Sequence, residues 1–175
     1  MHKLLITSVL VGGTALVAAQ APAQVPPPAA PAAVPEQMPF DIPYGPPITL
    51  ERAMQAAAAA AAEAKKHNWK LAISVVDPNG DLVLFQKMDG TQVASVPISQ
   101  GKARTAARYR CETRTFFNAM ETGHPYIATL DPTLVASPGG FPLMDNGKII
   151  GAMGCSGGTG DQDAVACKAG TAAIM

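Results

Sequence analysis

The sequence lacks the charge pattern of a protein that binds nucleic acid or an anionic membrane. Its 13 basic and 13 acidic residues give a formal net charge of zero, and its 175 residues contain no basic run. Phosphate-rich partners are held by clusters of lysine and arginine. The sequence therefore predicts that neither nucleic acid nor an anionic membrane is the main partner.

Cysteine and histidine, the usual ligands of structural zinc, are also scarce. The chain has three of each, with no C-x-x-C motif and no cysteine–histidine pair at zinc-finger spacing. This pattern predicts no structural zinc site. Cys155 and Cys167 stand at the end of a predicted strand and inside the next predicted helix. A disulfide and two buried free thiols both fit this placement, and Cys111 makes the cysteine count odd.

The longest apolar run, Leu4–Ala19, is too short to span a bilayer. It has about 16 residues, against the roughly 20 that a transmembrane helix needs, and no basic stop follows it. Lys3 precedes the run, and a small-x-small cleavage site follows at Ala21–Ala23. This order predicts a signal peptide at residues 1–23 and an exported mature chain, periplasmic or secreted, with no integral membrane segment after cleavage.

Proline is concentrated in the next segment, residues 24–47, which also has few charges. Closely spaced prolines favour extended polyproline conformations, so the segment is predicted to be a linker or tether. Its last part, Met38–Tyr44, carries enough apolar side chains to lie along the domain surface or a neighbouring subunit. The folded domain is then expected over residues 48–175.

Within residues 48–175 the sequence pattern alternates between helices and hairpins. In order, it predicts a helix over 50–66 with Thr49 as its N-cap, a hairpin over 71–88 with its turn at 77–81, helices over 98–109 and 112–121, a hairpin over 143–155 with its turn at 145–147, and a helix over 162–174. Hairpins pair antiparallel strands. The predicted fold class is therefore α+β, an antiparallel sheet with helices on its faces.

Several short motifs follow one another through this domain. They are Val76–Val83 (VDPNGDLV), Lys102–Ala106 (KARTA), Gly139–Leu143 (GGFPL), Asn146–Gly158 and Asp161–Asp163. Their order resembles the GlcG/HbpS family, which is related to the C-terminal domain of PduO. The resemblance implies a profilin-like fold with a five-stranded antiparallel sheet flanked by helices. It also implies haem as a cofactor and assembly into a homo-oligomer, a dimer, tetramer or octamer.

Eight residues are predicted to bind the ligand. Unpaired N–H groups at a helix N-terminus after a glycine-rich turn can bind a carboxylate, and two nearby cations suit haem propionates. The predicted set is Lys102, Arg104, Gly139, Gly140, Phe141, Pro142, Gly157 and Gly158. The glycines also fit a tight strand-to-helix turn. The two cations also fit a solvated helix face or an ion pair with Asp161 or Asp163.

Only His67 and His124 follow the predicted cleavage site, so any imidazole bond to haem iron must use one of them. His124 lies on a predicted loop, where functional side chains concentrate, and is the predicted iron ligand. The thioethers of Met144 and Met153 are softer alternatives, and we expect both methionines in the core.

These features predict an exported domain that binds a small anionic ligand, with haem as the leading candidate and haem degradation or sensing as its related activities. Two other functions fit the same residues. One is an enzyme of isomerase or tautomerase type that acts on small oxo- or hydroxy-acids, with an aspartate or histidine as base. The other is a non-catalytic oligomeric assembly protein.

Overall fold

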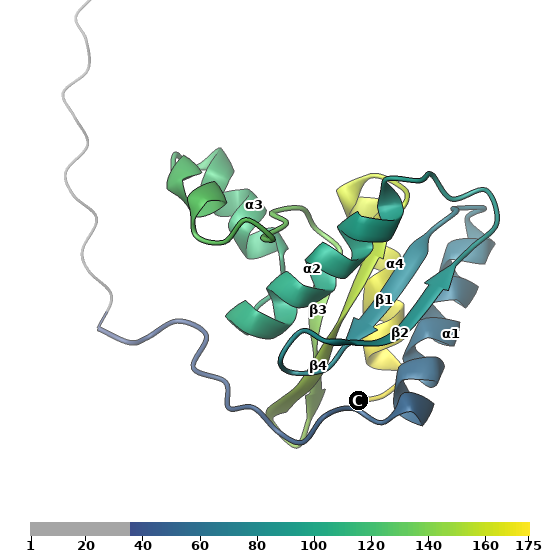
Figure 1. The fold of residues 1–175 in the computed structure, drawn as a ribbon, viewed down its shortest axis with the longest axis horizontal. Coiled ribbons are helices and arrows are strands. Elements are labelled where there is room, and N and C mark those ends of the chain that lie inside the picture. Colours follow the sequence, from purple (N-terminus) through teal and green to yellow (C-terminus); the bar gives the residue numbers. More distant parts are fainter. Residues whose placement is uncertain (1–35) are drawn as a thin grey trace, which may run out of the picture. The chain divides into compact units, whose positions relative to one another are not determined.

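Two β-hairpins supply the strands of one antiparallel sheet in the computed structural model, which describes residues 36–175 (Figure 1). The predicted signal peptide and residues 24–35 of the predicted linker lie outside the described residues. The elements are α1 (Leu50–Lys66), β1 (Ala72–Val76), β2 (Leu82–Lys87), α2 (Ser95–Tyr109), α3 (Arg114–Glu121), the 3₁₀ turn η1 (Pro125–Thr129), β3 (Gly140–Asp145), β4 (Lys148–Ser156) and α4 (Gly160–Ala172).

The sheet has four strands within the described residues, in the order β2-β1-β4-β3, so the expectation of five strands is wrong. The segment before α1 makes only one parallel bridge to β4, between Tyr44 and Ile149. The backbone N–H of Ile149 donates to the Pro43 carbonyl at 2.9 Å, and Gly45 donates back to the Ile149 carbonyl at 2.8 Å. Pro46 and Pro47 follow and have no N–H to continue the ladder, so no strand develops.

Helices α1 and α4 cover one face of the sheet, and Figure 1 shows them behind it. The alanines of α1 recur at helical spacing on its buried side, at positions 53, 56, 57, 60, 61 and 64. They pack against apolar side chains that include Ile73 and Val75 of β1 and Met153 of β4. The run of small residues therefore does form one buried face, which lets α1 lie close to its neighbours.

Helix α2 crosses the opposite face of the sheet, nearest to the viewer in Figure 1. Ala103, Ala106 and Ala107 pack on Val76 and Ala152. A side chain at position 154 of β4 would collide with the Ser99 carbonyl of α2, which explains the glycine there. The helix begins three residues before the predicted start because Pro97 stands in its first turn, where a missing N–H costs nothing.

A disulfide joins Cys155 at the end of β4 to Cys167 in α4, with 5.6 Å between the Cα atoms. This finding decides between the two readings that the sequence left open. Thr159 caps α4, and Gln162 completes the capping box. Cys111 is a buried free thiol in a smaller cluster with Phe116 and Ile127. Among residues 36–175 no helix is long and apolar enough to cross a bilayer.

Candidate ligand-binding site

The predicted glycine loops surround a buried ion pair. Lys102 Nζ lies 2.7 Å from Asp163 Oδ2, and the two side chains are 1% and 3% exposed. Lys102 also donates to the Pro138 carbonyl at 2.8 Å. The Gly158 backbone N–H donates to Asp163 Oδ1 at 2.9 Å. We call these residues, with Gly139, Gly140 and Gly157, the Lys102–Asp163 cluster.

Glycine is required where the chain passes this ion pair. Gly139 has a φ of +115°, and a Cβ there would lie 2.8 Å from Asp163 Cβ and 3.2 Å from Lys102 Nζ. Only a residue without a side chain can adopt this conformation at so short a distance. Lys102 therefore occupies the ion pair that the sequence offered as its alternative role, and the loops enclose it.

Burial governs the titration of this pair. It raises the pKa of the Asp163 carboxyl and lowers the pKa of the Lys102 amine, because both charged forms lose their hydration. Each partner's charge opposes these shifts without overcoming them. The Lys102 ammonium is held by protein oxygens on the inside of the domain and has no open side from which a ligand could reach it.

Arg104 lies apart from the cluster, beside the β1–β2 turn. Its Nε donates to the Gly80 carbonyl at 3.3 Å. One helical turn later, Arg108 Nε donates to the Asn79 carbonyl at 3.0 Å. Arg104 and Arg108 therefore both contact the β1–β2 turn, and Arg104 is not part of the site around Lys102.

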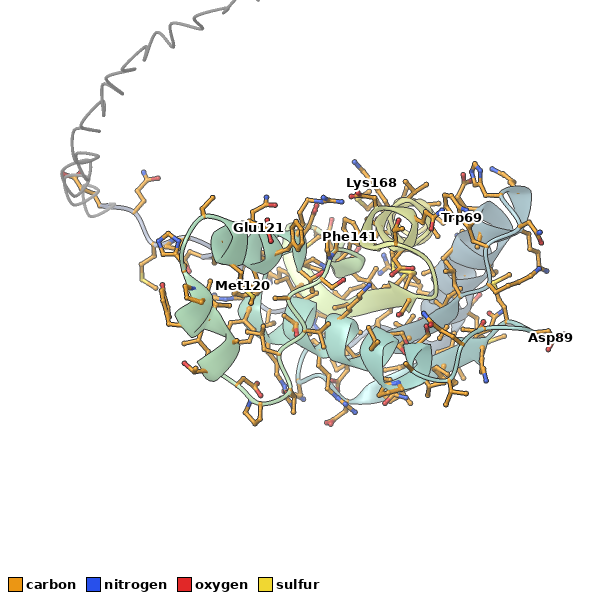
Figure 2. All side chains as sticks on the ribbon, turned by 90° about the horizontal axis from the view of Figure 1, so that it is seen from above. Trp69, Asp89, Met120, Glu121, Phe141 and Lys168 are labelled. Atoms are coloured by element: carbon orange, nitrogen blue, oxygen red, sulfur yellow. A yellow bond between two sulfur atoms is a disulfide. The ribbon has the colours of Figure 1, made fainter. Side chains whose placement is uncertain are left out.

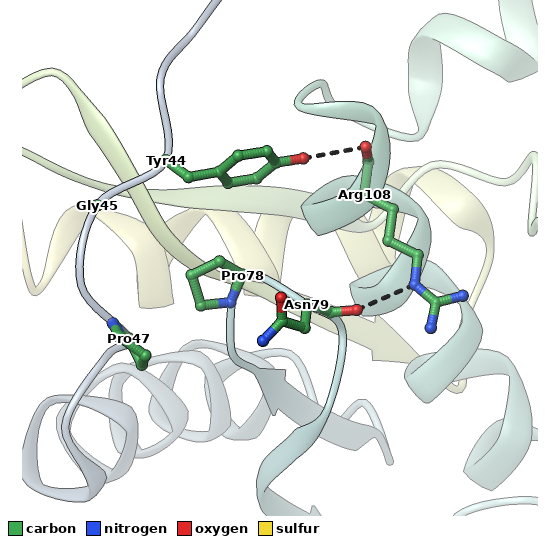
Figure 3. Close-up of a pocket in the computed structure, with 6 residues that line it drawn as sticks. All are labelled: Tyr44, Gly45, Pro47, Pro78, Asn79 and Arg108. Atoms are coloured by element: carbon green, nitrogen blue, oxygen red, sulfur yellow. Dashed lines mark hydrogen bonds between the residues drawn. The ribbon is translucent and has the colours of Figure 1, made fainter.

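A pocket of about 510 Å³ opens beside Arg108 (Figure 3). It is lined by Tyr44, Gly45, Pro47, Pro78, Asn79 and Arg108. The Tyr44 hydroxyl donates to the carbonyls of Ala107 and Arg108 at 3.0 and 3.1 Å, at the end of α2. Arg108 is the single cation in the lining, and its Nε is already bound to Asn79. This pocket offers little for a large apolar anion.

His124 is exposed at the start of η1. Its Nδ1 lies 3.3 Å from the Ala119 carbonyl, and its ring meets Tyr126 edge-on at 6.0 Å between centroids. His67 is also exposed, 3.2 Å from Glu63 and stacked on Trp69. Within residues 36–175 no three His, Cys, Asp or Glu side chains gather in a way that could hold a metal ion.

A second cavity, of about 470 Å³, lies at β3, the edge strand of the sheet, and we call it the β3 groove. Its walls come from the segment before α1, the end of α2, β3 itself and the C-terminal part of α4. The lining residues are Phe40, Ile42, Arg110, Cys111, Glu112, Phe141, Pro142, Met144, Lys168, Thr171, Ala172 and Met175. Most of these side chains are apolar, so the groove suits a flat hydrophobic molecule.

Arg110 fixes one wall of the β3 groove. Its Nη1 donates to the Ile42 carbonyl at 3.2 Å and lies 3.8 Å from Asp41 Oδ1. Its guanidinium also stands over the Tyr44 ring, 5.8 Å from the centroid. These contacts hold Phe40 and Ile42 against the domain. A guanidinium has five N–H donors, so others remain for a ligand carboxylate.

Lys168 of α4 supplies a second cation to the lining of the groove. It is exposed on α4, and Figure 2 shows it on the same side of the molecule as Phe141. Among the described residues its ammonium makes no ion pair within 4.0 Å. Cys111 lies in the wall as a neutral thiol, because burial raises its pKa to about 11. The groove thus combines apolar walls with one exposed cation, Lys168, and one partly exposed cation, Arg110, that already contacts Ile42 and Asp41.

Two of the eight predicted ligand residues, Phe141 and Pro142, line the β3 groove, while Lys102, Arg104 and the four glycines do not. Sequence reasoning missed Arg110, Lys168 and the wall formed by Phe40 and Ile42. The apolar composition of Met38–Tyr44 was the one available signal for that wall. Met153 is buried as expected, but Met144 is only half-buried and faces the groove.

One antiparallel sheet with α1 and α4 on one face and α2 on the other defines an α+β domain. The family model described as "Haem degrading protein HbpS-like" matches residues 48–172. The chain therefore belongs to the HbpS-like family.

Individual relatives agree with this assignment. Protein GlcG of Escherichia coli K12 is 40% identical over 94 residues, which cover 54% of this chain and 69% of GlcG. The crystal structure of a double mutant of Streptomyces reticuli HbpS is similar with a TM-score of 0.70 and 28% identity, covering 83% of this chain and 99% of that one. A crystal structure described as a PduOC–haem complex gives a TM-score of 0.69 and 25% identity, covering 73% and 95%.

Proposed function

We propose that this protein binds haem in the β3 groove. The observation that carries the proposal is the combination of an apolar cavity with two cations, Arg110 and Lys168, in its lining. Haem is a flat apolar macrocycle with two carboxylates on one edge. Apolar walls bury the macrocycle, while Arg110 and Lys168 form charge-assisted hydrogen bonds with the carboxylates.

The comparisons support the choice of haem among apolar anions. The chain belongs to a family described as haem degrading, and one structural neighbour is a complex with haem. Bound haem would supply iron for redox and oxygen chemistry, and with it haem degradation or haem sensing. The protein's own part is to exclude water from the macrocycle with Phe40, Ile42 and Phe141 and to orient its carboxylates with Arg110 and Lys168.

An absorption titration with haemin tests the proposal. Ala172 lies at the end of α4 in the groove lining, so Ala172→Trp fills the cavity from an exposed position. The matched control is Ala62→Trp, which places the same side chain on an exposed position of α1. We expect saturable haem binding by the wild type and by Ala62→Trp, and loss of binding in Ala172→Trp.

Two results would overturn this proposal. The first is equal haem binding by both tryptophan variants, which would place haem elsewhere. The second is no binding by the wild type combined with thermal stabilisation by small oxo- or hydroxy-acids, which would favour an enzyme that acts on such acids.

We further infer that the chain is exported, as the signal-peptide pattern predicts. The Cys155–Cys167 disulfide supports this inference, because disulfides persist in oxidising compartments outside the cytoplasm. The mass of the protein recovered from fractionated cells is the test. A mature chain that begins at Gln24 in the exported fraction is expected, and an uncleaved chain in the cytoplasm would contradict the inference.

We also infer a homo-oligomer. Exposed apolar side chains support a contact between copies of the chain, among them Phe117 (39%) on α3, Tyr126 (59%) on η1 and Leu130 (54%) directly after η1. Light scattering on the purified protein gives the mass directly. A multiple of the chain mass is expected, and a monomer at all concentrations would contradict the inference.

A further inference from the structure

One wall of the β3 groove comes from a short segment that precedes the first helix, residues 40–44, which we call the strap. Phe40 and Ile42 of the strap line the groove. The family model begins its match at residue 48, so this wall lies outside the matched residues. The strap is therefore a feature of this chain that the family assignment does not describe.

The strap is attached to the domain less firmly than the strand and the helix that form other walls of the groove. β3 pairs with β4 along Gly140–Asp145, and α4 is tied to β4 by the Cys155–Cys167 disulfide. Within the described residues the strap bridges β4 at one residue pair, Tyr44 and Ile149. Local opening begins where few backbone hydrogen bonds hold the chain. The strap is therefore the wall of the groove that we expect to open most readily.

The backbone of Phe40 is in an unfavourable conformation. Its φ is +62°, in the left-handed region that a residue with a bulky side chain rarely adopts. Such a conformation persists only where the surrounding contacts impose it. Those contacts lie at the next two residues, where Arg110 Nη1 donates to the Ile42 carbonyl at 3.2 Å and lies 3.8 Å from Asp41 Oδ1. Once they break, we expect the backbone to relax and the Phe40 ring to leave the groove.

Tyr44 holds the other end of the strap. Its hydroxyl lies 3.0 and 3.1 Å from the carbonyl oxygens of Ala107 and Arg108 and donates its proton to them (Figure 3). The last carbonyls of a helix have no partner within the helix, so α2 offers free acceptors at this position. The guanidinium of Arg110 stands over the same ring, 5.8 Å from its centroid. Tyr44 thus fastens the strap to the end of α2, while its ring lines the pocket beside Arg108.

We propose that haem leaves the β3 groove when the strap opens, and that Tyr44 is the positioning residue that keeps the strap closed. The inference rests on the proposed function and adds the route by which the ligand is released. Tyr44 acts through Phe40 and Ile42, whose side chains form the wall that has to move. Loss of the Tyr44 hydroxyl removes its hydrogen bonding to α2, which shifts the strap toward its open state by about tenfold.

The test compares the full-length wild type with Tyr44→Phe, which removes the hydroxyl and keeps the ring. The first readout is the rate at which haem dissociates into an excess of apomyoglobin. The second needs no haem and is hydrogen exchange at the amides of Gly45 and Ile149, whose hydrogen bonds join the strap segment to β4. Exchange at these amides reports how often the strap opens.

Two control variants separate strap opening from a general loss of stability. Tyr126→Phe makes the same substitution at an exposed position of η1. Thr91→Val removes a hydroxyl that donates to the Met88 carbonyl at 2.7 Å, in the loop that follows β2. β2 and β3 are the two opposite edges of the sheet, so Thr91→Val lowers the free energy of unfolding at a site far from the groove.

In Tyr44→Phe we expect haem to dissociate about tenfold faster and the Gly45 and Ile149 amides to exchange faster by a similar factor. In both control variants we expect the dissociation rate of the wild type. An unchanged dissociation rate in Tyr44→Phe, or an equal acceleration in Thr91→Val, would overturn the role of the strap in release. Absence of haem binding by the wild type would instead overturn the proposed function, and unchanged amide exchange in Tyr44→Phe would then still show that Tyr44 does not hold the strap.

Discussion

The Lys102–Asp163 cluster and the β3 groove both present cations close to small or aromatic residues, but they use them in different ways. In the cluster, Lys102 is 1% exposed, and its ammonium contacts Asp163 and the Pro138 carbonyl. In the groove, Lys168 is exposed and makes no ion pair among the described residues. A lysine can therefore bind a ligand or stabilise the fold, and burial with a protein partner decides which.

The difference has an energetic basis. Removing an ammonium or a carboxylate from water costs several kcal/mol, and the attraction between the two charges only roughly repays that cost. Each charge of the pair therefore needs the other, while the net contribution of the pair to the free energy of unfolding is small. Lys168, the exposed cation of the groove, keeps its hydration until a ligand replaces it, so it remains available for binding.

The largest expected effect follows from breaking the buried pair. Asp163→Ala leaves the Lys102 ammonium buried without a counter-charge, and we expect the free energy of unfolding to fall by about 3–5 kcal/mol. Chemical denaturation measures it. Asp161→Ala is the control, because that carboxylate is 79% exposed in its pair with Arg114 and should contribute less than about 1 kcal/mol.

A double variant sharpens this result. Lys102→Met combined with Asp163→Leu removes both charges, and we expect it to recover most of the stability that either single change loses. If the loss of unfolding free energy in the double variant equals the sum of the losses in the two single variants, the two charges do not depend on each other.

The next effect concerns the disulfide beside the cluster. Cys155 and Cys167 close a loop with a sequence separation of 12, and reducing this bond should lower the free energy of unfolding by about 3 kcal/mol. The measurement compares oxidised wild type with the Cys155→Ala/Cys167→Ala variant. Haem affinity of the folded protein should not change, because neither cysteine lines the β3 groove. A large loss of haem affinity without a loss of unfolding free energy would show that the disulfide region and the β3 groove are coupled.

On the groove side, the titration of Cys111 is expected to differ from that of an exposed thiol. Its pKa is raised from the ordinary value of 9.0 to about 11, so the thiol form stabilises the fold below pH 9, and this contribution is lost as the pH rises through about 11. The thiolate absorbance of wild type minus that of Cys111→Ala gives the midpoint. A midpoint near 9 would show that the thiol is accessible to water.

The smallest expected effect comes from a single exposed cation. Lys168→Ala should weaken haem binding about tenfold, through one lost charge-assisted hydrogen bond, without changing the free energy of unfolding. Haemin titration and chemical denaturation measure the two quantities. Lys65→Ala on α1 is the control. Equal affinities for the two variants would remove Lys168 from the binding site.

Local sequence signals predicted most of the fold. The two hairpins followed from turn residues such as Asn146-Gly147, and the last helix, predicted over 162–174, is found at Gly160–Ala172. Both features depend on neighbours within a few residues. The sequence did not predict the bridge between Tyr44 and Ile149, because these two residues are far apart in the chain. The family resemblance implied a fifth strand without locating it, and the described residues form four.

The candidate site was harder to predict because four distant parts of the chain build it. Phe40, Arg110, Phe141 and Lys168 meet only in the folded domain, and no motif connects them. The predicted glycine motifs do shape the backbone, but glycine is needed there because the backbone passes close to the Lys102–Asp163 pair. A motif that encloses a buried charge and one that encloses a ligand have the same composition, so sequence alone could not separate them.

The most direct test of where the ligand binds is the effect of paramagnetic haemin on the backbone amide signals of the isotopically labelled protein. If haem occupies the β3 groove, the signals of Ile42, Met144 and Lys168 should broaden first, and those of Arg104, His124 and Gly158 should persist. Broadening of Gly158 and Arg104 with an unchanged Lys168 signal would contradict the account and place the ligand at the glycine loops.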